Sequence, residues 1–93
     1  MPGAFFASSD LMALSALRTF SDMSLQVPER VAVIGLTNLE MSRYSNPPLT
    51  TISQPIRKLA ATAFKALLVR LRYPNNDPRE ILLDAPLIIR KTT

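Results

Sequence analysis

Apolar and polar positions in the first quarter of the chain predict a short strand followed at once by a helix. Residues 4–7 are an apolar run that ends at Ser8, Ser9 and Asp10, which is typical of a buried strand stopped by capping residues. Residues 11–20 contain neither proline nor glycine, so Asp10 or Ser9 is expected to cap a helix there. The apolar arc of this helix is too wide for one covered face, and we expect its burial on two sides.

A second apolar run, Val31–Leu36, is rich in β-branched residues and predicts a central parallel strand covered on both faces. Together with the preceding strand and helix it makes one βαβ unit. Periodicity is then lost over residues 37–48, which contain the Pro47-Pro48 pair and indicate a loop. Residues 49–52 are extended and β-prone.

The clearest helical period follows Pro55 and ends before Pro74, with apolar side chains at spacings of three and four residues. Ser53 or Gln54 is expected to cap this helix. Beyond the turn at 75–78, residues 81–83 and 87–89 predict two short strands. The expected fold class is α/β, with parallel strands and flanking helices in the order β-α-β-loop-β-α-β-β.

Composition removes many kinds of chemistry. The 93 residues allow one domain or a piece of one, and they contain no Cys and no His. Zinc sites, disulfides, thiol nucleophiles and imidazole bases are therefore excluded, and two glycines are too few for a P-loop or a dinucleotide fingerprint. The carboxylates are scattered along the chain, so no acid–base pair is indicated, and no nucleophile with an activating base can be assembled from these residues. We therefore expect no enzyme, and we expect no cofactor.

The net charge of +4 raises the alternative of a basic nucleic-acid-binding module. Its cations would be those on the polar arc of the second helix: Arg57, Lys58, Lys65 and Arg72. Basic residues are spread over the whole chain and the aromatics lie mostly at expected core positions, so a solvated helix face is favoured. No apolar run is long enough for a transmembrane helix, and the first basic side chain is Arg18, so a cytoplasmic location is expected.

Polar side chains follow the ends of two expected parallel strands. Ser8 and Ser9 come after the first strand and Thr37 comes after the second, so their side chains would point into a common crevice. Asp10 lies at the same place, but a helix cap is the favoured interpretation for this carboxylate.

Four stretches together resemble the LacI/GalR family of bacterial transcription regulators. They are FASSDLMALSAL (6–17), VPERVAVIG (27–35), PPLTTISQP (47–55) and LIIRKT (87–92). In order and spacing they are similar to the last third of the family's effector-binding region. The resemblance implies a periplasmic-binding-protein-like fold of two α/β subdomains, with a small-molecule effector, typically a sugar, in the cleft between them.

The resemblance also implies a division of the chain. Residues 1–48 would belong to the C-terminal subdomain and 49–54 to the crossover. Residues 55–73 would form a helix of the N-terminal subdomain, and 79–93 the returning strands. The family's helix-turn-helix headpiece is not among these residues, so operator DNA would be bound only through a missing part. Effector affinity is expected to be weak or lost in this chain.

Family positions that contact the effector correspond to Ser9, Thr37 and Gln54. Asn is usual at the first of these positions, and many sugar-binding members have Asp at the second. A threonine offers one weaker hydroxyl there, which puts the usual sugar specificity in doubt.

Family positions that form the homodimer correspond to Leu14, Arg18 and Tyr44. A different class of function remains open beside the resemblance: an autonomous small α/β module that self-associates and binds no ligand.

Overall fold

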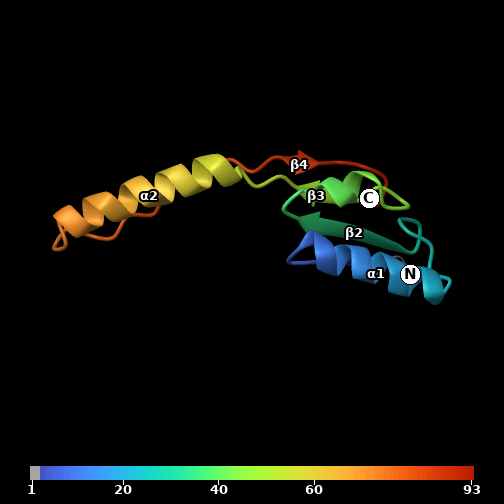
Figure 1. Ribbon diagram of the computed structural model, residues 1–93. Coiled ribbons are helices and arrows are strands. Elements are labelled where there is room, and N and C mark those ends of the chain that lie inside the picture. The colour runs from blue at the N-terminus through green and yellow to red at the C-terminus, as the bar shows by residue number, and fades with distance from the viewer. Residues whose placement is uncertain (1–2) are drawn as a thin grey trace. The chain divides into compact units, whose positions relative to one another are not determined.

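The computed structural model describes residues 3–93, which divide into two compact units (Figure 1). Residues 3–53 and 86–93 form the first unit, and residues 54–85 form the second. Among the described residues, no helix has both the length and the apolar character needed to cross a membrane.

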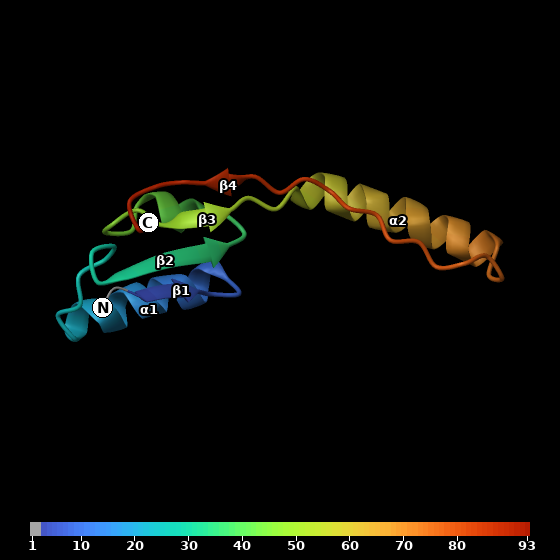
Figure 2. The same ribbon diagram turned by 180° about the vertical axis from the view of Figure 1, so that it is seen from behind.

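The first unit is built on a sheet with strand order β1-β2-β3-β4. The strands are β1 (Gly3–Phe6), β2 (Val31–Leu36), β3 (Thr50–Ile52) and β4 (Leu87–Ile88). The first three are parallel, whereas β4 runs antiparallel to β3. Helix α1 (Asp10–Asp22) connects β1 to β2 and packs against the sheet (Figure 2), so the predicted βαβ unit and the α/β fold class are confirmed.

The C-terminal segment hydrogen-bonds to β2 at Val33, just before the residues of β2 that pair with β3. The Val33 N–H donates to the Thr92 carbonyl oxygen at 2.8 Å, and the Thr92 hydroxyl donates to the Val33 carbonyl oxygen at 2.6 Å. The same hydroxyl accepts from the Thr50 N–H at 2.8 Å. Thr92 is fully buried, and its side chain thus satisfies backbone groups of both β2 and β3.

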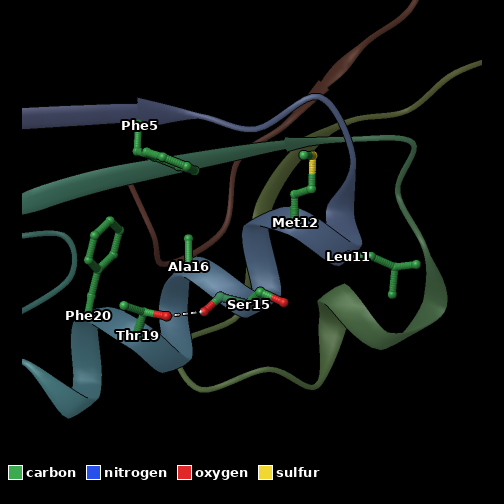
Figure 3. Close-up of a pocket in the computed structure, with 7 residues that line it drawn as sticks. All are labelled: Phe5, Leu11, Met12, Ser15, Ala16, Thr19 and Phe20. Atoms are coloured by element: carbon green, nitrogen blue, oxygen red, sulfur yellow. Dashed lines mark hydrogen bonds between the residues drawn. The ribbon is translucent and has the colours of Figure 1, made fainter.

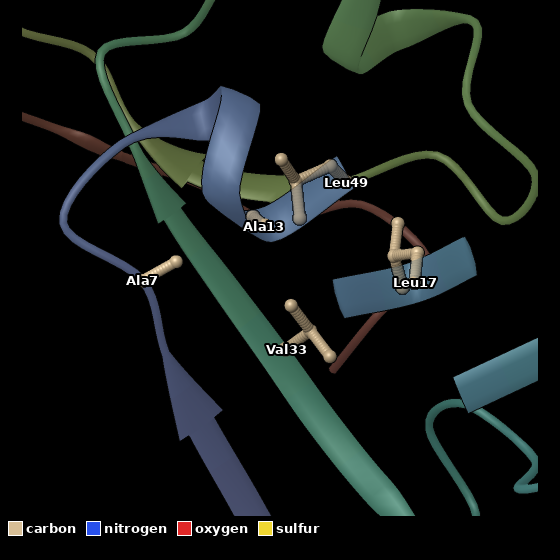
Figure 4. Close-up of a cluster of buried hydrophobic side chains, with 5 residues drawn as sticks. All are labelled: Ala7, Ala13, Leu17, Val33 and Leu49. Carbon is tan, nitrogen blue, oxygen red and sulfur yellow. The ribbon is translucent and has the colours of Figure 1, made fainter. Parts of the chain in front are cut away.

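The hydrophobic core of the first unit lies between α1 and the sheet (Figure 4). It consists of Ala7, Ala13, Leu17, Val33 and Leu49. Gly35 faces the same layer, where a Cβ atom would collide with the Asp10 carboxylate and approach Leu49 Cδ2 to 2.9 Å. Glycine is required at this position by close packing.

Burial of the strands differs from the sequence-based expectation. All of β1 is exposed, although it was expected to be buried, because it is an edge strand with no neighbour on its outer side among the described residues. In β2 only Val33 and Gly35 are fully buried; the alternate residues point to the opposite face and are half-buried. Cover on both faces of β2 is therefore wrong for the described part of the chain.

Two further expectations of the element order are corrected. Residues 81–83 form no strand, so one strand follows α2 where two were expected. A strand needs a hydrogen-bonded neighbour, and apolar composition alone does not supply one. The expected loop at 37–48 contains a short 3-10 helix, η1 (Glu40–Arg43).

The second unit is dominated by helix α2 (Ile56–Arg72), which confirms the helix predicted from periodicity. Its N-cap position is occupied by Pro55, and no side chain caps it, so the expected cap by Ser53 or Gln54 is wrong. No residue of α2 is buried. Its apolar side chains, including Phe64 at 61% exposure, have no covering layer among the described residues, and most of the aromatics expected in the core are exposed.

We predict that Gly35→Ala destabilises the first unit. The added methyl group must displace the Asp10 carboxylate or Leu49, and such overpacking costs about 1–3 kcal/mol of unfolding free energy. Urea unfolding followed by circular dichroism measures this loss. Gly3→Ala is the matched control, because no atom lies within 4 Å of its added Cβ. An equal, small change in both variants would contradict the packing described for Gly35.

Candidate functional site

The carboxyl ends of β1, β2 and β3 lie at one edge of the first unit's sheet, because the three strands are parallel neighbours. Polar residues follow each strand: Ser8 and Ser9 after β1, Thr37 and Asn38 after β2, and Ser53 after β3. Open α/β sheets bind ligands at this edge. We call this group of strand ends the carboxyl edge.

A fully buried carboxylate organises the carboxyl edge. Asp10 Oδ1 accepts a hydrogen bond from the Thr51 hydroxyl at 2.6 Å, and Oδ2 accepts one from the Leu39 N–H at 2.7 Å. The Thr51 hydroxyl oxygen also accepts from the Asn38 N–H at 3.3 Å. Asp10 therefore ties the start of α1 to β3 and to the segment that follows β2.

This arrangement corrects the favoured interpretation of Asp10. The cap of α1 is Ser9, whose Oγ accepts from the Met12 N–H at 3.2 Å. Asp10 is the first residue of the helix, and both of its oxygens accept hydrogen bonds from beyond the helix. The buried Asp10 carboxylate thus stabilises the carboxyl edge through hydrogen bonds to Leu39 and Thr51.

The segment after β2 has an unusual backbone. Thr37 has φ of 123° and Asn38 has φ of 64°, a region that a β-branched residue rarely adopts and asparagine tolerates better. The Thr37 N–H donates to the Ile52 carbonyl oxygen at 2.9 Å, which extends the pairing of β2 with β3 by one residue. The Asn38 side-chain amide donates to Ser53 Oγ at 3.5 Å and accepts from Arg90 at 2.8 Å.

The sequence-based prediction placed Asn38 within the loop at 37–48 and did not single out Thr51 or Arg90. An asparagine two residues after the end of a parallel strand is a usable signal, because this residue tolerates left-handed φ values and carries both a donor and an acceptor. The roles of Thr51 and Arg90 depend on contacts with residues 41 and 52 positions away, which no local pattern marks.

The structure brings Ser9 and Thr37 to the same edge, and both are half-buried. They follow neighbouring strands, as the sequence predicted. Gln54 is half-buried and begins the second unit.

Leu14 and Arg18 lie on one face of α1, where they line a hollow of about 260 Å³ together with Ser45 and Asn46. Tyr44 directly precedes these two loop residues and is 76% exposed. The Arg18 guanidinium is paired with Asp22 on the next turn at 3.2 Å. The positions named for a dimer contact are thus exposed or line a common hollow.

A second flank of α1 presents an apolar hollow of about 530 Å³ (Figure 3). Phe5 and Phe20 meet there edge to face, with ring centroids 5.8 Å apart, and Leu11 and Met12 extend the surface along the helix. Leu11 is 60% exposed. The expectation that α1 is buried on two sides is therefore wrong for the described residues, since only the side with Ala13 and Leu17 is covered.

Comparison with known proteins identifies the class. The family model of periplasmic binding protein-like domains matches residues 1–93, and the chain belongs to this family. Within it, the chain belongs to the effector-binding region of LacI/GalR-type transcription regulators. The resemblance and the partial periplasmic-binding-protein-like fold expected from the sequence are both confirmed.

Three similar proteins illustrate the family. The HTH-type transcriptional repressor PurR of Photobacterium profundum is 38% identical over 91 residues, which are 98% of this chain and 27% of that protein. A LacI family regulator of Enterococcus faecalis with bound ribose is 36% identical, with a TM-score of 0.78 over 98% of this chain and 34% of its own. The lac repressor dimer bound to operator and the anti-inducer ONPF is 36% identical, with a TM-score of 0.80 over 97% of this chain and 31% of its own.

The chain thus spans about a quarter to a third of the length of these relatives. The relatives named here are regulators of transcription.

Proposed function

We propose that this chain is the effector-sensing and dimerising part of a LacI-type transcription regulator, and that its effector is a sugar. The observation that carries the proposal is the carboxyl edge, where Ser9, Thr37 and Asn38 are half-buried and the Asp10 carboxylate is held in place by hydrogen bonds from Thr51 and Leu39. The similar regulator of Enterococcus faecalis holds ribose. Residues 1–48 would belong to the C-terminal subdomain, 49–54 to the crossover, 55–73 to a helix of the N-terminal subdomain and 79–93 to the returning strands.

The edge offers groups that suit sugar hydroxyls. Hydroxyl side chains both donate and accept, so Ser9 and Thr37 could each bind a hydroxyl of a neutral polyol. Gln54, an effector contact by family resemblance, carries an amide that can also donate and accept. The Thr51 hydroxyl donates to the Asp10 carboxylate, but both groups are fully buried and out of reach of a substrate, so the proposed role is binding and not catalysis. Effector binding would shift the population of cleft conformations and change DNA affinity through a headpiece outside these residues. Because such a regulator acts on DNA, its proposed location is the cytoplasm.

A chimeric regulator tests this function. In it, residues 1–93 replace the matching segment of the Enterococcus faecalis regulator, and ribose binding is measured by calorimetry. We expect the chimera to bind ribose about tenfold more weakly than its parent, and Thr37→Asp to recover about tenfold, because a carboxylate accepts stronger hydrogen bonds than a hydroxyl.

The matched control is Thr19→Asp, an exposed threonine within α1 and outside the carboxyl edge. A chimera that folds and binds no ribose, even with Thr37→Asp, would contradict the proposed sugar effector. Equal affinities for the Thr37 and Thr19 variants would contradict the assignment of Thr37 to the site.

We further propose that Leu14, Arg18 and Tyr44 form a homodimer contact. Leu14→Asp is expected to lower the dimer fraction of the chain in sedimentation velocity, since it places a charge in an apolar contact. Leu11→Asp is the control, because Leu11 lies on the other exposed flank of α1. Dissociation by the Leu11 variant alone would assign self-association to the apolar hollow and refute this contact.

A further inference from the structure

The final segment of the chain carries an arginine that forms no ion pair within the part of the chain that the structure describes. Arg90 is half-buried, and its guanidinium donates three hydrogen bonds to neutral acceptors. Nη2 donates to Asn38 Oδ1 at 2.8 Å, and Nη1 donates to Ser42 Oγ and to the Leu49 carbonyl oxygen, each at 2.9 Å.

All three acceptors belong to the segment that joins β2 to β3, residues 37–49, which we call the β2–β3 connection. Asn38 lies at its start, Ser42 in η1 at its middle, and Leu49 at its end. Ser42 is fully buried and its Oγ also donates to the Leu39 carbonyl oxygen at 2.6 Å. One planar group therefore joins the start, the middle and the end of the connection.

The backbone that carries Arg90 is itself fixed. The Arg90 N–H donates to Thr50 Oγ1 at 2.9 Å, and the Lys91 N–H donates to the Pro48 carbonyl oxygen at 2.9 Å. The next residue is the fully buried Thr92, which bonds to β2 and β3. The guanidinium thus extends from the rigid sheet toward the carboxyl edge.

The start of the connection needs such support. Thr37 and Asn38 both hold positive φ values, and a non-glycine residue in that region is retained only where its surroundings fix it. Asp10 fixes the backbone at Leu39, and Arg90 fixes the side chain of Asn38. Lysine could not form these three hydrogen bonds in the same geometry, because its ammonium group is a compact charge at the end of a flexible side chain. The guanidinium group is planar and holds its N–H donors in fixed directions.

We propose that Arg90 is a positioning residue of the effector site: it orients the Asn38 amide and, through it, holds Thr37 at the carboxyl edge. This inference rests on the proposed function, since Thr37 is an effector contact only in that case. It assigns a task in the site to a residue that would contact no effector itself.

Amide hydrogen exchange of the full chain, resolved by mass spectrometry, tests the positioning role. Arg90→Ala and Arg90→Lys are expected to speed exchange in residues 37–49 about tenfold, while residues 31–36 of β2 stay within about twofold. The control is Lys91→Ala, because the Lys91 side chain is exposed and only its backbone is bonded. Combining Asn38→Ala with Arg90→Ala should add little, because both variants remove the same bond.

Full protection in Arg90→Lys would overturn the proposal, because the positive charge alone would then suffice. Faster exchange spread equally over β2 would also overturn it, since Arg90 would then support the fold and not the site.

The ribose-binding chimera supplies the second readout. Arg90→Lys should weaken ribose binding about tenfold, and Lys91→Ala should leave it unchanged. Local loosening of 37–49 with unchanged ribose affinity would refute the positioning role. A chimera that binds no ribose in any variant, with the predicted exchange pattern, would contradict the proposed function while supporting the Arg90 contact.

Discussion

The buried carboxylate of Asp10 is the interaction on which the first unit depends. A charge removed from water is tolerated only when its oxygens are hydrogen-bonded, and here Thr51 and Leu39 supply those bonds. The same carboxylate occupies the space where residue 35 would carry a side chain, so a glycine in β2 follows from it. The Asp10 side chain therefore joins helix α1, strand β3 and the β2–β3 connection at the carboxyl edge, where polar residues follow the ends of three strands.

The two units differ in how much of their apolar surface is covered. The first has a small core between α1 and the sheet, and its final segment completes the hydrogen bonding of β2 and β3. The second has a helix with an apolar stripe and no buried residue. Such a stripe contributes to stability only when it packs on another apolar surface. That the relatives are several times longer than the matched region agrees with this difference.

Local patterns predicted the elements well and their surroundings poorly. The apolar runs of β1 and β2 and the period of α2 mark secondary structure because strands and helices obey fixed repeats. The expected strand at 81–83 does not form and β1 is exposed, because pairing and burial depend on partners that a local pattern does not include.

In the candidate site, too, the features set by local sequence were predicted, and those set by distant residues were not. The placement of Ser9 and Thr37 at one edge of the sheet follows from where parallel strands end, and the assignment of Gln54 came from family resemblance alone. The role of Asp10 was misjudged because its partners are 29 and 41 residues away in the chain. Arg90 and Asn38 are 52 residues apart, and the bond between them is visible only in three dimensions.

The role of the buried Asp10 carboxylate is tested most directly by the unfolding free energy of Asp10→Asn, compared with that of Asp22→Asn, in urea titrations of the full chain. Asparagine offers a single carbonyl oxygen to the two donors, the Leu39 N–H and the Thr51 hydroxyl. At least one of these buried donors therefore loses its acceptor. We predict a loss of more than about 2 kcal/mol for Asp10→Asn, against less than about 0.5 kcal/mol for Asp22→Asn, because Asp22 is exposed. Equal, small losses in both variants would show that the buried carboxylate does not hold the carboxyl edge together.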